Sequence, residues 1–411
     1  MKYIINAQHI KEIQAEINLP SSKSIANRAL IINSLSSSTY SIQNLSESDD
    51  TKTLNKVLQS DANLFDIGHA GTAMRFLTAF LSQLAGEWEL TGSARMKQRP
   101  IKILVEALGQ LGAKIEYLDQ IGYPPLRILG KRLNGGMLEL DGSVSSQYIS
   151  ALLMIAPTLR GGLTLRLTNR VTSRSYIEMT LDLMEQYGIK SEWLSEKEIN
   201  IKEQDYKPIS FTVESDWSGA SYWYELLAMI PQGEIFLPNI QLNSLQGDCA
   251  IVSWFESFGI QSISKDNGIL LKKNRLVVPK RLDLDFILNP DIAQTMAVLC
   301  VMQKVPFHFT GLETLKIKET NRITALQNEL AKFGASLIEP QHGELSWDGS
   351  FPLQKQENPL ILTYHDHRMA LAFAPAALFG ELIIDEPMEV TKSYPRFYED
   401  LKAVGFYIRE L

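Results

Sequence analysis

Apolar and polar positions along the chain follow two periodicities. Short apolar runs such as Gly136–Leu140, Gly162–Leu167 and Gly233–Leu237 are typical of strands. Between such runs lie longer segments in which apolar residues return every three or four positions, as in amphipathic helices. These predicted helices are Ala73–Leu84, Ile101–Leu111, Ser146–Ala156, Ser175–Tyr187, Ala220–Met229, Ile292–Met302, Ile323–Phe333 and His367–Ala377. The alternation of strands and helices predicts an α/β protein.

A short phrase with a central glycine recurs where predicted helices end. Its five copies are Leu111-Gly112-Ala113, Tyr187-Gly188-Ile189, Phe258-Gly259-Ile260, Phe333-Gly334-Ala335 and Val404-Gly405-Phe406. Each is typical of a glycine C-cap followed by an apolar residue that enters a strand. The copies are about 70–77 residues apart, which is too long a period for a solenoid of small repeats. We therefore predict a repeated α/β unit, with domain crossings near Pro20 and around Glu214–Ser215.

Composition narrows the class of protein. The 411 residues are 45% hydrophobic and 21% charged, which fits two or three globular domains rather than disorder or a fibre. No apolar run reaches the roughly 18–20 residues of a membrane span, and the first twenty residues lack the features of a signal peptide. The two cysteines, Cys249 and Cys300, lie far apart without ligand-like neighbours, as expected in a reduced cytoplasm.

The net charge of −7 argues against a general nucleic-acid or anionic-membrane binder. Basic residues nevertheless gather in short stretches, beginning with LPSSKSIANRAL at Leu19–Leu30. Here hydroxyls, an ammonium and a guanidinium crowd one helix N-terminus, where cations oppose the helix dipole unless an anion is bound. A serine-capped helix with two solvated bases is the alternative. Local basic clusters in an acidic chain are typical of an enzyme with a small anionic substrate.

Further polar motifs precede other predicted helices. They are GHAGTAMR at 68–75, RMKQRP at 95–100, DGSVSSQY at 141–148, NPDIAQT at 289–295, KIKETNR at 316–322 and HDHRM at 365–369, followed by Lys392. Gly71 would let a ligand approach the backbone, and arginines would supply forks for carboxylate or phosphate. Ser145 and Asp291 could equally be helix caps, and the charge run at 95–100 a solvated face. Neither metal-ligand spacing nor a Walker or Rossmann glycine motif is present in the sequence.

Taken in order, these motifs resemble the 5-enolpyruvylshikimate-3-phosphate synthase family. The resemblance runs from Leu19 to Tyr398 and also includes the stretch SDWSGASYW at 215–223. It implies a two-domain inside-out α/β barrel in which each domain contains three βαβαββ units, helices inside and sheets outside. The domains would be 1–20 with 214–411, and 21–213, with the active site in the cleft between them.

The resemblance also implies roles for individual residues. Shikimate 3-phosphate would be bound by Lys23, Ser24, Arg28, Ser145, Ser146, Gln147, Ser173, Tyr176, Asp291 and Lys318. Phosphoenolpyruvate would be bound by Lys23, Gly71, Arg95, Gln147, Arg322, His367, Arg368 and Lys392. Acid–base catalysis would fall to Lys23, Asp291 and Glu319, and the resemblance leaves open which residue makes each proton transfer.

The implied reaction transfers the enolpyruvyl group of phosphoenolpyruvate to the 5-hydroxyl of shikimate 3-phosphate and releases phosphate. This is a step of the shikimate pathway towards chorismate and the aromatic amino acids. We therefore expect a cytoplasmic monomer whose partners are these two small molecules, with no cofactor, no metal, no nucleic acid and no membrane. Domain closure on shikimate 3-phosphate is expected as well.

The sequence departs from the family's pattern at several positions. His69 stands where Asn is usual, Phe76 where many members have Pro, and Asn321 where many have Asp. Thr314 replaces an Asn that contacts the substrate, so that contact is in question. The segment Asp49–Gly68 is shorter than usual, which predicts that one repeat unit is truncated.

Two other classes of protein could share part of this pattern. A UDP-N-acetylglucosamine enolpyruvyl transferase would share the fold and chemistry, but that family has a cysteine in the loop corresponding to Thr91–Pro100 and an Asn in place of Ser24. A non-catalytic anion-binding protein would need the basic residues but need not keep Asp291 and Glu319. Because both acids are present and the loop has no cysteine, the first resemblance is favoured.

Overall fold

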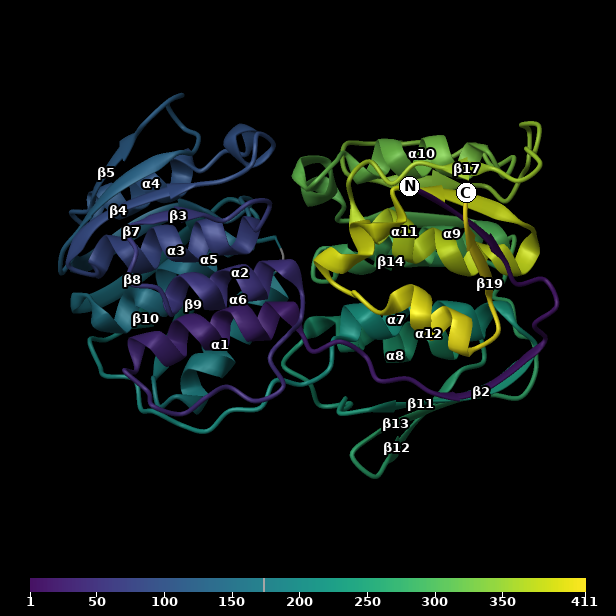
Figure 1. Cartoon of the computed structure of the whole chain (residues 1–411), viewed down its shortest axis with the longest axis horizontal. Coiled ribbons are helices and arrows are strands. Elements are labelled where there is room, and N and C mark those ends of the chain that lie inside the picture. Colours follow the sequence, from purple (N-terminus) through teal and green to yellow (C-terminus); the bar gives the residue numbers. More distant parts are fainter. Residues whose placement is uncertain (173) are drawn as a thin grey trace. The chain divides into compact units, whose positions relative to one another are not determined.

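The chain divides into two compact units in the computed structural model, which describes residues 1–172 and 174–411 (Figure 1). Unit 1 consists of Met1–Pro20 together with Glu214–Leu411, and unit 2 is Ser21–Val213. Unit 2 is thus an insertion between two segments of unit 1. The insertion separates strand β2 (Glu12–Glu16) from helix α7 (Trp217–Met229), which follow one another in unit 1.

One arrangement, βαβαββ, is repeated in both units. In unit 2 its first copy is β3 (Leu64–Asp66), α3 (Gly71–Gln83), β4 (Gly86–Thr91), α4 (Lys102–Gln110), β5 (Lys114–Tyr117) and β6 (Leu126–Gly130). The second copy is β7 (Asn134–Asp141), α5 (Ser146–Ile155), β8 (Arg160–Thr168), α6 (Arg174–Gln186), β9 (Ser191–Ser195) and β10 (Glu198–Ile201). The sheets have the equivalent orders β3-β4-β6-β5 and β7-β8-β10-β9, and in each the first two strands are parallel.

The third copy in unit 2 is truncated, as the sequence predicts. Its helices are α1 (Lys23–Leu35) and α2 (Asp49–Leu58). Among the described residues its sheet is reduced to one isolated parallel bridge between Gln43 and Thr212. The short segment 49–68 accommodates α2 and little else before β3 begins.

Unit 1 contains three copies. The first is β2, α7, β11 (Gln232–Pro238), α8 (Ile251–Glu256), β12 (Gln261–Lys265) and β13 (Gly268–Lys273). The second is β14 (Leu282–Asp285), α9 (Ala293–Met302), β15 (Phe307–Thr310), α10 (Arg322–Ala331) and β16 (Leu345–Trp347), with a bridge at Ile338 in place of a full strand. The third is β17 (Leu360–Ile361), α11 (His367–Phe373), β18 (Leu382–Asp385), α12 (Phe397–Ala403) and β19 (Tyr407–Glu410).

The third copy lacks a last strand of its own, and the N-terminal strand β1 (Lys2–Asn6) fills that place. β1 pairs antiparallel with β18 on one side and with β19 on the other, so the sheet order is β17-β18-β1-β19. Figure 1 shows the two chain ends lying close together in this part of unit 1. The first residues therefore complete the sheet formed by the last ones.

The first helix of each copy in unit 1 lies in the interior, with the sheets outside it (Figure 1). Every residue of α7, α9 and α11 is buried. The amphipathic pattern predicted for these three helices is therefore wrong, since none keeps a solvent face. Their sequences are mostly apolar or small, and such a helix is stable when it is surrounded by protein.

The second helices end as the glycine phrases predict. The φ angles of Gly112, Gly188, Gly259, Gly334 and Gly405 lie between +79° and +101°, in the left-handed region. In each case the residue after the glycine donates its backbone N–H to the carbonyl five positions earlier, as Ala113 does to Leu108. This is the hydrogen bond of the Schellman motif, and it sends the chain directly into the next strand.

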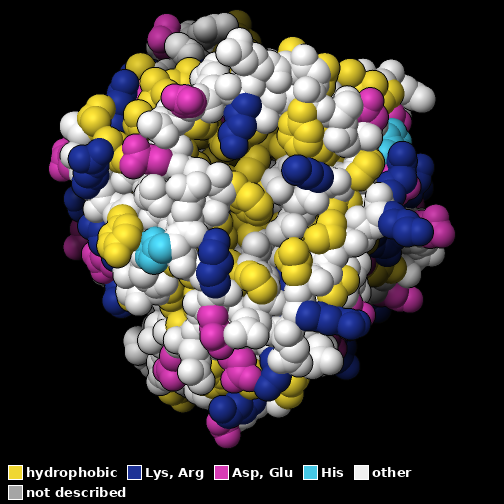
Figure 2. All heavy atoms as spheres, turned by 90° about the vertical axis from the view of Figure 1, so that its right-hand side faces the viewer, with side chains coloured by type: hydrophobic (Ala, Val, Ile, Leu, Met, Phe, Trp, Pro, Cys, Tyr) yellow, Lys and Arg dark blue, Asp and Glu magenta, His cyan; other side chains and the backbone are white. Residues whose placement is uncertain are grey.

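The surface mixes charge types on the face that Figure 2 shows. Basic and acidic side chains there are scattered among apolar ones, whereas a nucleic-acid surface would gather Lys and Arg. Within the described residues, the helices are all too short or too polar to span a bilayer.

Glu225 is an ionisable side chain inside the core of unit 1. It lies on α7 with 0% exposure, and neither carboxylate oxygen has a hydrogen-bond partner among the described residues. Burial raises the pKa of this carboxyl well above its ordinary value of 4.5. The folded protein therefore keeps Glu225 protonated at pH values where the unfolded chain ionises it.

Replacing Glu225 by Gln should raise the melting temperature at pH 7. Below about pH 4.5 Glu225 is protonated in both the folded and the unfolded state, so it does not lower the free energy of unfolding. Above that pH the unfolded state releases the proton, and the free energy of unfolding falls as pH rises. Gln at this position does not ionise and avoids this loss. Each kcal/mol recovered is worth about 2–4 °C in Tm for a unit of this size. Thermal unfolding of both proteins between pH 4 and 8 measures the difference.

Glu256→Gln is the matched control, because Glu256 lies on the exposed side of α8 in the same unit. Its effect on Tm should be small at every pH. A Glu225→Gln gain that persists unchanged at pH 4 would show that the buried ionisation is not its cause.

Candidate active site

The sequence motifs mark the starts of helices at equivalent places in the repeated unit. The motifs at 19–30, 68–75, 141–148, 215–223, 289–295 and 365–369 lie at the starts of α1, α3, α5, α7, α9 and α11, the first helix of each copy. Those at 95–100 and 316–322, and Lys392, precede the second helices α4, α10 and α12. Helix N-termini carry unpaired N–H groups and partial positive charge, so anions are favoured there.

In unit 2, α1 is capped by Ser22 rather than by Ser24. The hydroxyl of Ser22 accepts from the N–H of Ile25 at 3.4 Å. Lys23 is the first helical residue and is half-buried, as is Ser24. Among the described residues, the Lys23 ammonium has no recorded ion pair or hydrogen bond. Its cation is therefore available to a ligand in this unit.

Arg28 lies one turn further along α1 and is buried. Its guanidinium donates to the hydroxyls of Thr180 (2.7 Å) and Ser150 (2.9 Å), and to the carbonyls of Ser24 (2.8 Å) and Tyr176 (3.4 Å). All four partners are neutral. Burial lowers the pKa of Arg28 from 12.5 to about 10, partly offset by Tyr176, so the side chain stays charged at neutral pH.

The starts of α3 and α5 are joined by a hydrogen bond. The amide nitrogen of Gln147 donates to the hydroxyl of Thr72 at 3.1 Å. A side chain at Gly71 would collide with the guanidinium of Arg99, which lies against the helix start. Arg75, on the next turn of α3, is buried and donates to the carbonyl of Gly71 at 2.9 Å. Gly71 thus allows arginine to approach the backbone.

The other residues predicted in unit 2 lie around these. Ser145 is the N-cap of α5 and accepts from the N–H of Gln147 at 3.4 Å, which confirms the capping interpretation. Ser146 begins that helix, and Tyr176 lies on α6 beside Arg28. Arg95 is exposed and contacts Gln98 at 3.3 Å. Ser173 lies outside the described residues.

Three departures from the family's pattern have structural accommodations. His69 shares a 2.9 Å hydrogen bond with Ser93, which joins two motif loops. Phe76 is buried with its ring 5.5 Å from the Arg28 guanidinium. Asn321 caps α10 by accepting from the N–H of Thr324 at 3.3 Å, a role that Asp would also fill.

In unit 1, Arg322 is the centre of a buried charge cluster. Its side chain is 2% exposed, and its guanidinium contacts three carboxylates. Asp366 takes two hydrogen bonds at 2.7 and 3.2 Å, Asp291 one at 3.0 Å and Glu319 one at 3.1 Å. Burial acts to lower the pKa of Arg322, but the three carboxylates outweigh it and raise that pKa above its ordinary value.

Asp291 joins three cations of this cluster. Besides Arg322, its carboxylate pairs with Arg368 at 2.9 Å, and its Oδ1 lies 3.8 Å from the ammonium of Lys318. Asn289 and Ile292, the cap positions before α9, make no side-chain cap bond. The 3-10 turn Pro290–Ile292 instead directs Asp291 toward the arginines.

Lys318 and His367 lie at the edge of the cluster. Burial lowers the pKa of the Lys318 ammonium; Arg322 and Arg368 act in the same direction, and Asp291 and Glu319 oppose them. His367 begins α11 and is buried, with its Nδ1 3.9 Å from the carboxylate of Asp366. Lys318, although near these charges, keeps 30% of its side chain exposed.

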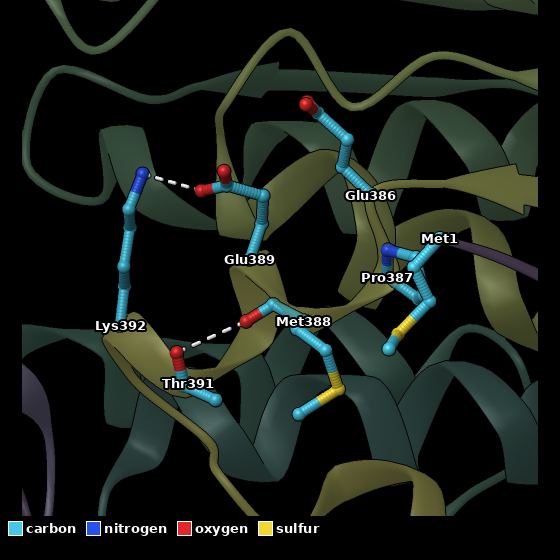
Figure 3. A pocket seen from close by; sticks show the side chains of 7 residues that line it. All are labelled: Met1, Glu386, Pro387, Met388, Glu389, Thr391 and Lys392. Atoms are coloured by element: carbon cyan, nitrogen blue, oxygen red, sulfur yellow. Dashed lines mark hydrogen bonds and ion pairs between the residues drawn. The ribbon is translucent and has the colours of Figure 1, made fainter.

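Lys392 ends a 3-10 turn rather than lying in an irregular loop. Its ammonium pairs with Glu389 (Figure 3). The same ammonium donates to the carbonyl of His365 at 2.8 Å. It therefore contacts the loop that carries Asp366 and Arg368. A hollow of about 360 Å³ adjoins it, lined by Met1, Glu386, Pro387, Met388, Glu389, Thr391 and Lys392.

Comparisons with known proteins agree with this geometry. The family model described as EPSP synthase (3-phosphoshikimate 1-carboxyvinyltransferase) matches residues 7–60 and 58–401. The chain belongs to the EPSP synthase family. It is 50% identical over 410 residues to the 3-phosphoshikimate 1-carboxyvinyltransferase of Bacteroides fragilis, covering 100% of this chain and 99% of that one. The Vibrio cholerae protein of the same name is 36% identical over 424 residues, with 96% and 98% covered.

A solved EPSP synthase structure has the same fold. The enzyme from Acinetobacter baumannii matches with a TM-score of 0.79 and 18% identity, over 100% of both chains. The repeated βαβαββ units described above are thus those of an EPSP synthase. Within this family member, unit 1 gathers Asp291, Lys318, Glu319, Arg322 and Arg368 into one cluster.

Some residues at these sites were not singled out from the sequence. Arg99 and Arg75 lie close to Gly71. From the run at 95–100, only Arg95 was assigned to substrate binding. Asp366 holds Arg322, and Glu389 holds Lys392. Position just before a helix was the available signal for Asp366 and Arg99. Nothing in the sequence pairs Glu389 with Lys392 except their three-residue spacing.

Replacing Asp366 by Asn should destabilise unit 1 strongly. Asn keeps the cap of α11 but removes the charge that offsets buried Arg322, and breaking a buried pair costs about 3–5 kcal/mol. Denaturant unfolding of both proteins measures the loss.

Asp283→Asn is the matched control, since Asp283 also takes two hydrogen bonds from an arginine, Arg281, but both side chains are more than half exposed. It should cost less than about 1 kcal/mol. Equal losses for the two variants would show that burial of Arg322 does not set the energy.

Proposed function

We propose that this chain transfers the enolpyruvyl group of phosphoenolpyruvate to the 5-hydroxyl of shikimate 3-phosphate, with release of phosphate. The observation that carries the proposal is that the chain matches the EPSP synthase family over almost its whole length. The motifs of the chain also lie at helix starts, where anions are favoured. The names of the relatives describe this transfer. The two units supply different parts of the chemistry.

Unit 2 supplies cations with neutral surroundings. Lys23 has no recorded partner among the described residues, and Arg28 is held by hydroxyls and carbonyls. A phosphate or carboxylate near them would gain charge-assisted hydrogen bonds without displacing an acid. Lys23, Ser24, Arg28, Ser145, Ser146, Gln147, Ser173 and Tyr176 are accordingly proposed to bind shikimate 3-phosphate, together with Asp291 and Lys318.

Unit 1 supplies acids among arginines. Asp291 and Glu319 both contact Arg322, so a substrate carboxylate that binds Arg322 or Arg368 competes with them. We propose that phosphoenolpyruvate makes this exchange and so releases a carboxylate to work as a base. Its cradle consists of Lys23, Gly71, Arg95, Gln147, Arg322, His367, Arg368 and Lys392.

The reaction needs two coordinated proton transfers. The methylene carbon of phosphoenolpyruvate gains a proton. The 5-hydroxyl of shikimate 3-phosphate loses its proton and adds to the neighbouring carbon of phosphoenolpyruvate, which forms a tetrahedral intermediate. Loss of a proton and of phosphate from that intermediate restores the double bond. Lys23, Asp291 and Glu319 are the proposed acid–base residues, and no step calls for a cofactor. We propose further that the protein acts as a cytoplasmic monomer.

Phosphate release should require both substrates and neither added metal nor nucleotide. In this assay Lys23→Ala should lower kcat by roughly 10²–10⁴-fold, the usual share of a general acid or base. Initial rates at saturating substrates, with and without a chelator, test both statements.

The control is Lys56→Ala, which removes an exposed lysine from α2 in the same unit and should leave kcat unchanged. An unaltered kcat in Lys23→Ala, with only the KM values raised, would exclude an acid–base role. Activity that is abolished by the chelator and restored by zinc would exclude the metal-free reaction.

Phosphoenolpyruvate should bind more tightly once shikimate 3-phosphate is present. We propose that the first substrate offsets the repulsion between the basic residues of the two units and draws the units together. The gain should be about 5–150-fold and should shrink as salt rises. Calorimetry with each ligand alone, and then with both, measures it; equal affinities would mean that the cradle is formed beforehand.

A further inference from the structure

A group of potential metal ligands lies beside the candidate active-site residues of unit 1. His365 comes from the loop before α11, whereas Glu386 and Glu389 follow β18. The Nδ1 atom of His365 is 3.0 Å from Oε2 of Glu386 and 3.3 Å from Oε1 of Glu389. One ligand atom from each residue lies within 4.8 Å of the others. None of the three residues has a role in the proposed reaction.

The distances suit a small divalent ion. In tetrahedral zinc sites the bonds are about 2.0–2.2 Å, so neighbouring ligand atoms are about 3.3–3.6 Å apart. The two measured separations lie at or just below that range, and small side-chain rotations of exposed residues would adjust them. One imidazole nitrogen with two carboxylate oxygens is a donor set that zinc and neighbouring transition metals accept.

We propose that His365, Glu386 and Glu389 form a surface site for a divalent transition-metal ion, with zinc as the best fit. Three protein ligands leave a fourth position for water. His365 is 72% and Glu386 46% exposed, so an ion can enter without opening the core. Both residues have positive φ angles (+56° and +49°), a backbone conformation uncommon outside glycine.

The site contacts the proposed phosphoenolpyruvate cradle, because Glu389 is paired with Lys392. Oε1 of Glu389 lies 3.3 Å from Nδ1 of His365. Oε2 of Glu389 pairs with the ammonium of Lys392 (Figure 3). With neutral His365, the two glutamates and Lys392 sum to −1, and a bound divalent ion changes this to +1. The bound ion therefore weakens the ion pair between Glu389 and Lys392. It also makes the local electrostatic potential more positive, which favours anions. This consequence, which rests on the proposed function, is a lower KM for phosphoenolpyruvate.

Cobalt(II) is the probe for the test, because its visible absorption bands report coordination directly. Titration into the untagged full-length chain should give one saturable site that zinc displaces. His365→Asn and Glu386→Gln should each weaken cobalt binding by at least about tenfold. Asn is chosen because it tolerates positive φ. Absence of such bands, or bands unchanged in both variants, overturns the site.

Matched controls are His342→Asn and Glu357→Gln, which alter exposed residues of the same unit outside the group. Both should bind cobalt as the parent does. Glu386→Gln should keep its metal-free kcat but lose the effect of zinc on KM. A bound ion with an unchanged KM in the parent overturns the coupling to Lys392 and leaves the site standing. An inactive parent that still binds cobalt overturns the proposed function alone.

Discussion

A single buried guanidinium organises the loops of unit 1. Arg322 cannot lose its proton, so its charge must be met inside the protein, and leaving it unmet would cost several kcal/mol. The carboxylates that meet it come from the loops before α9, α10 and α11, which belong to two different copies of the repeated unit. Holding Arg322 therefore also holds these three loops at fixed positions.

Unit 2 treats its buried arginine in the opposite way. Arg28 is surrounded by hydroxyls and carbonyls, so its positive charge is desolvated but not cancelled. The same repeated architecture thus yields one half-site whose charges balance and another that remains cationic. For a reaction between two anionic substrates, both units thus supply cations, whereas the carboxylates Asp291 and Glu319 are supplied by unit 1.

Local features of the fold could be predicted from the sequence. The five glycine phrases determine where helices end, because left-handed backbone and the hydrogen bond to the carbonyl five residues back depend on neighbouring residues only. Most predicted helix bounds lie within two residues of those observed, although α7 begins earlier and α11 ends as a 3-10 turn. The solvent face expected for α9 was wrong because burial on every side is decided by its neighbours.

Pairings between distant residues could not be predicted in this way. Asp291 had the position of a helix cap, and only the fold brings Arg322 and Arg368 to it. In the sequence, Arg99 is one of three equivalent bases between positions 95 and 100. Only the fold places its guanidinium against Gly71. Glu389 and Lys392 are close in sequence, but the contact of both with His365 depends on the adjoining loop.

The placement of β1 has a consequence for synthesis of the protein. This strand is synthesised before unit 2, yet both of its neighbours, β18 and β19, are synthesised after unit 2. Unit 2 is contiguous in the chain and can fold as soon as it emerges. The sheet that contains β1 must wait, with β1 unpaired, until β18 and β19 have been synthesised. A chain arrested before Leu382 would therefore carry a folded unit 2 flanked by exposed strands, the usual starting point for aggregation and for chaperone binding.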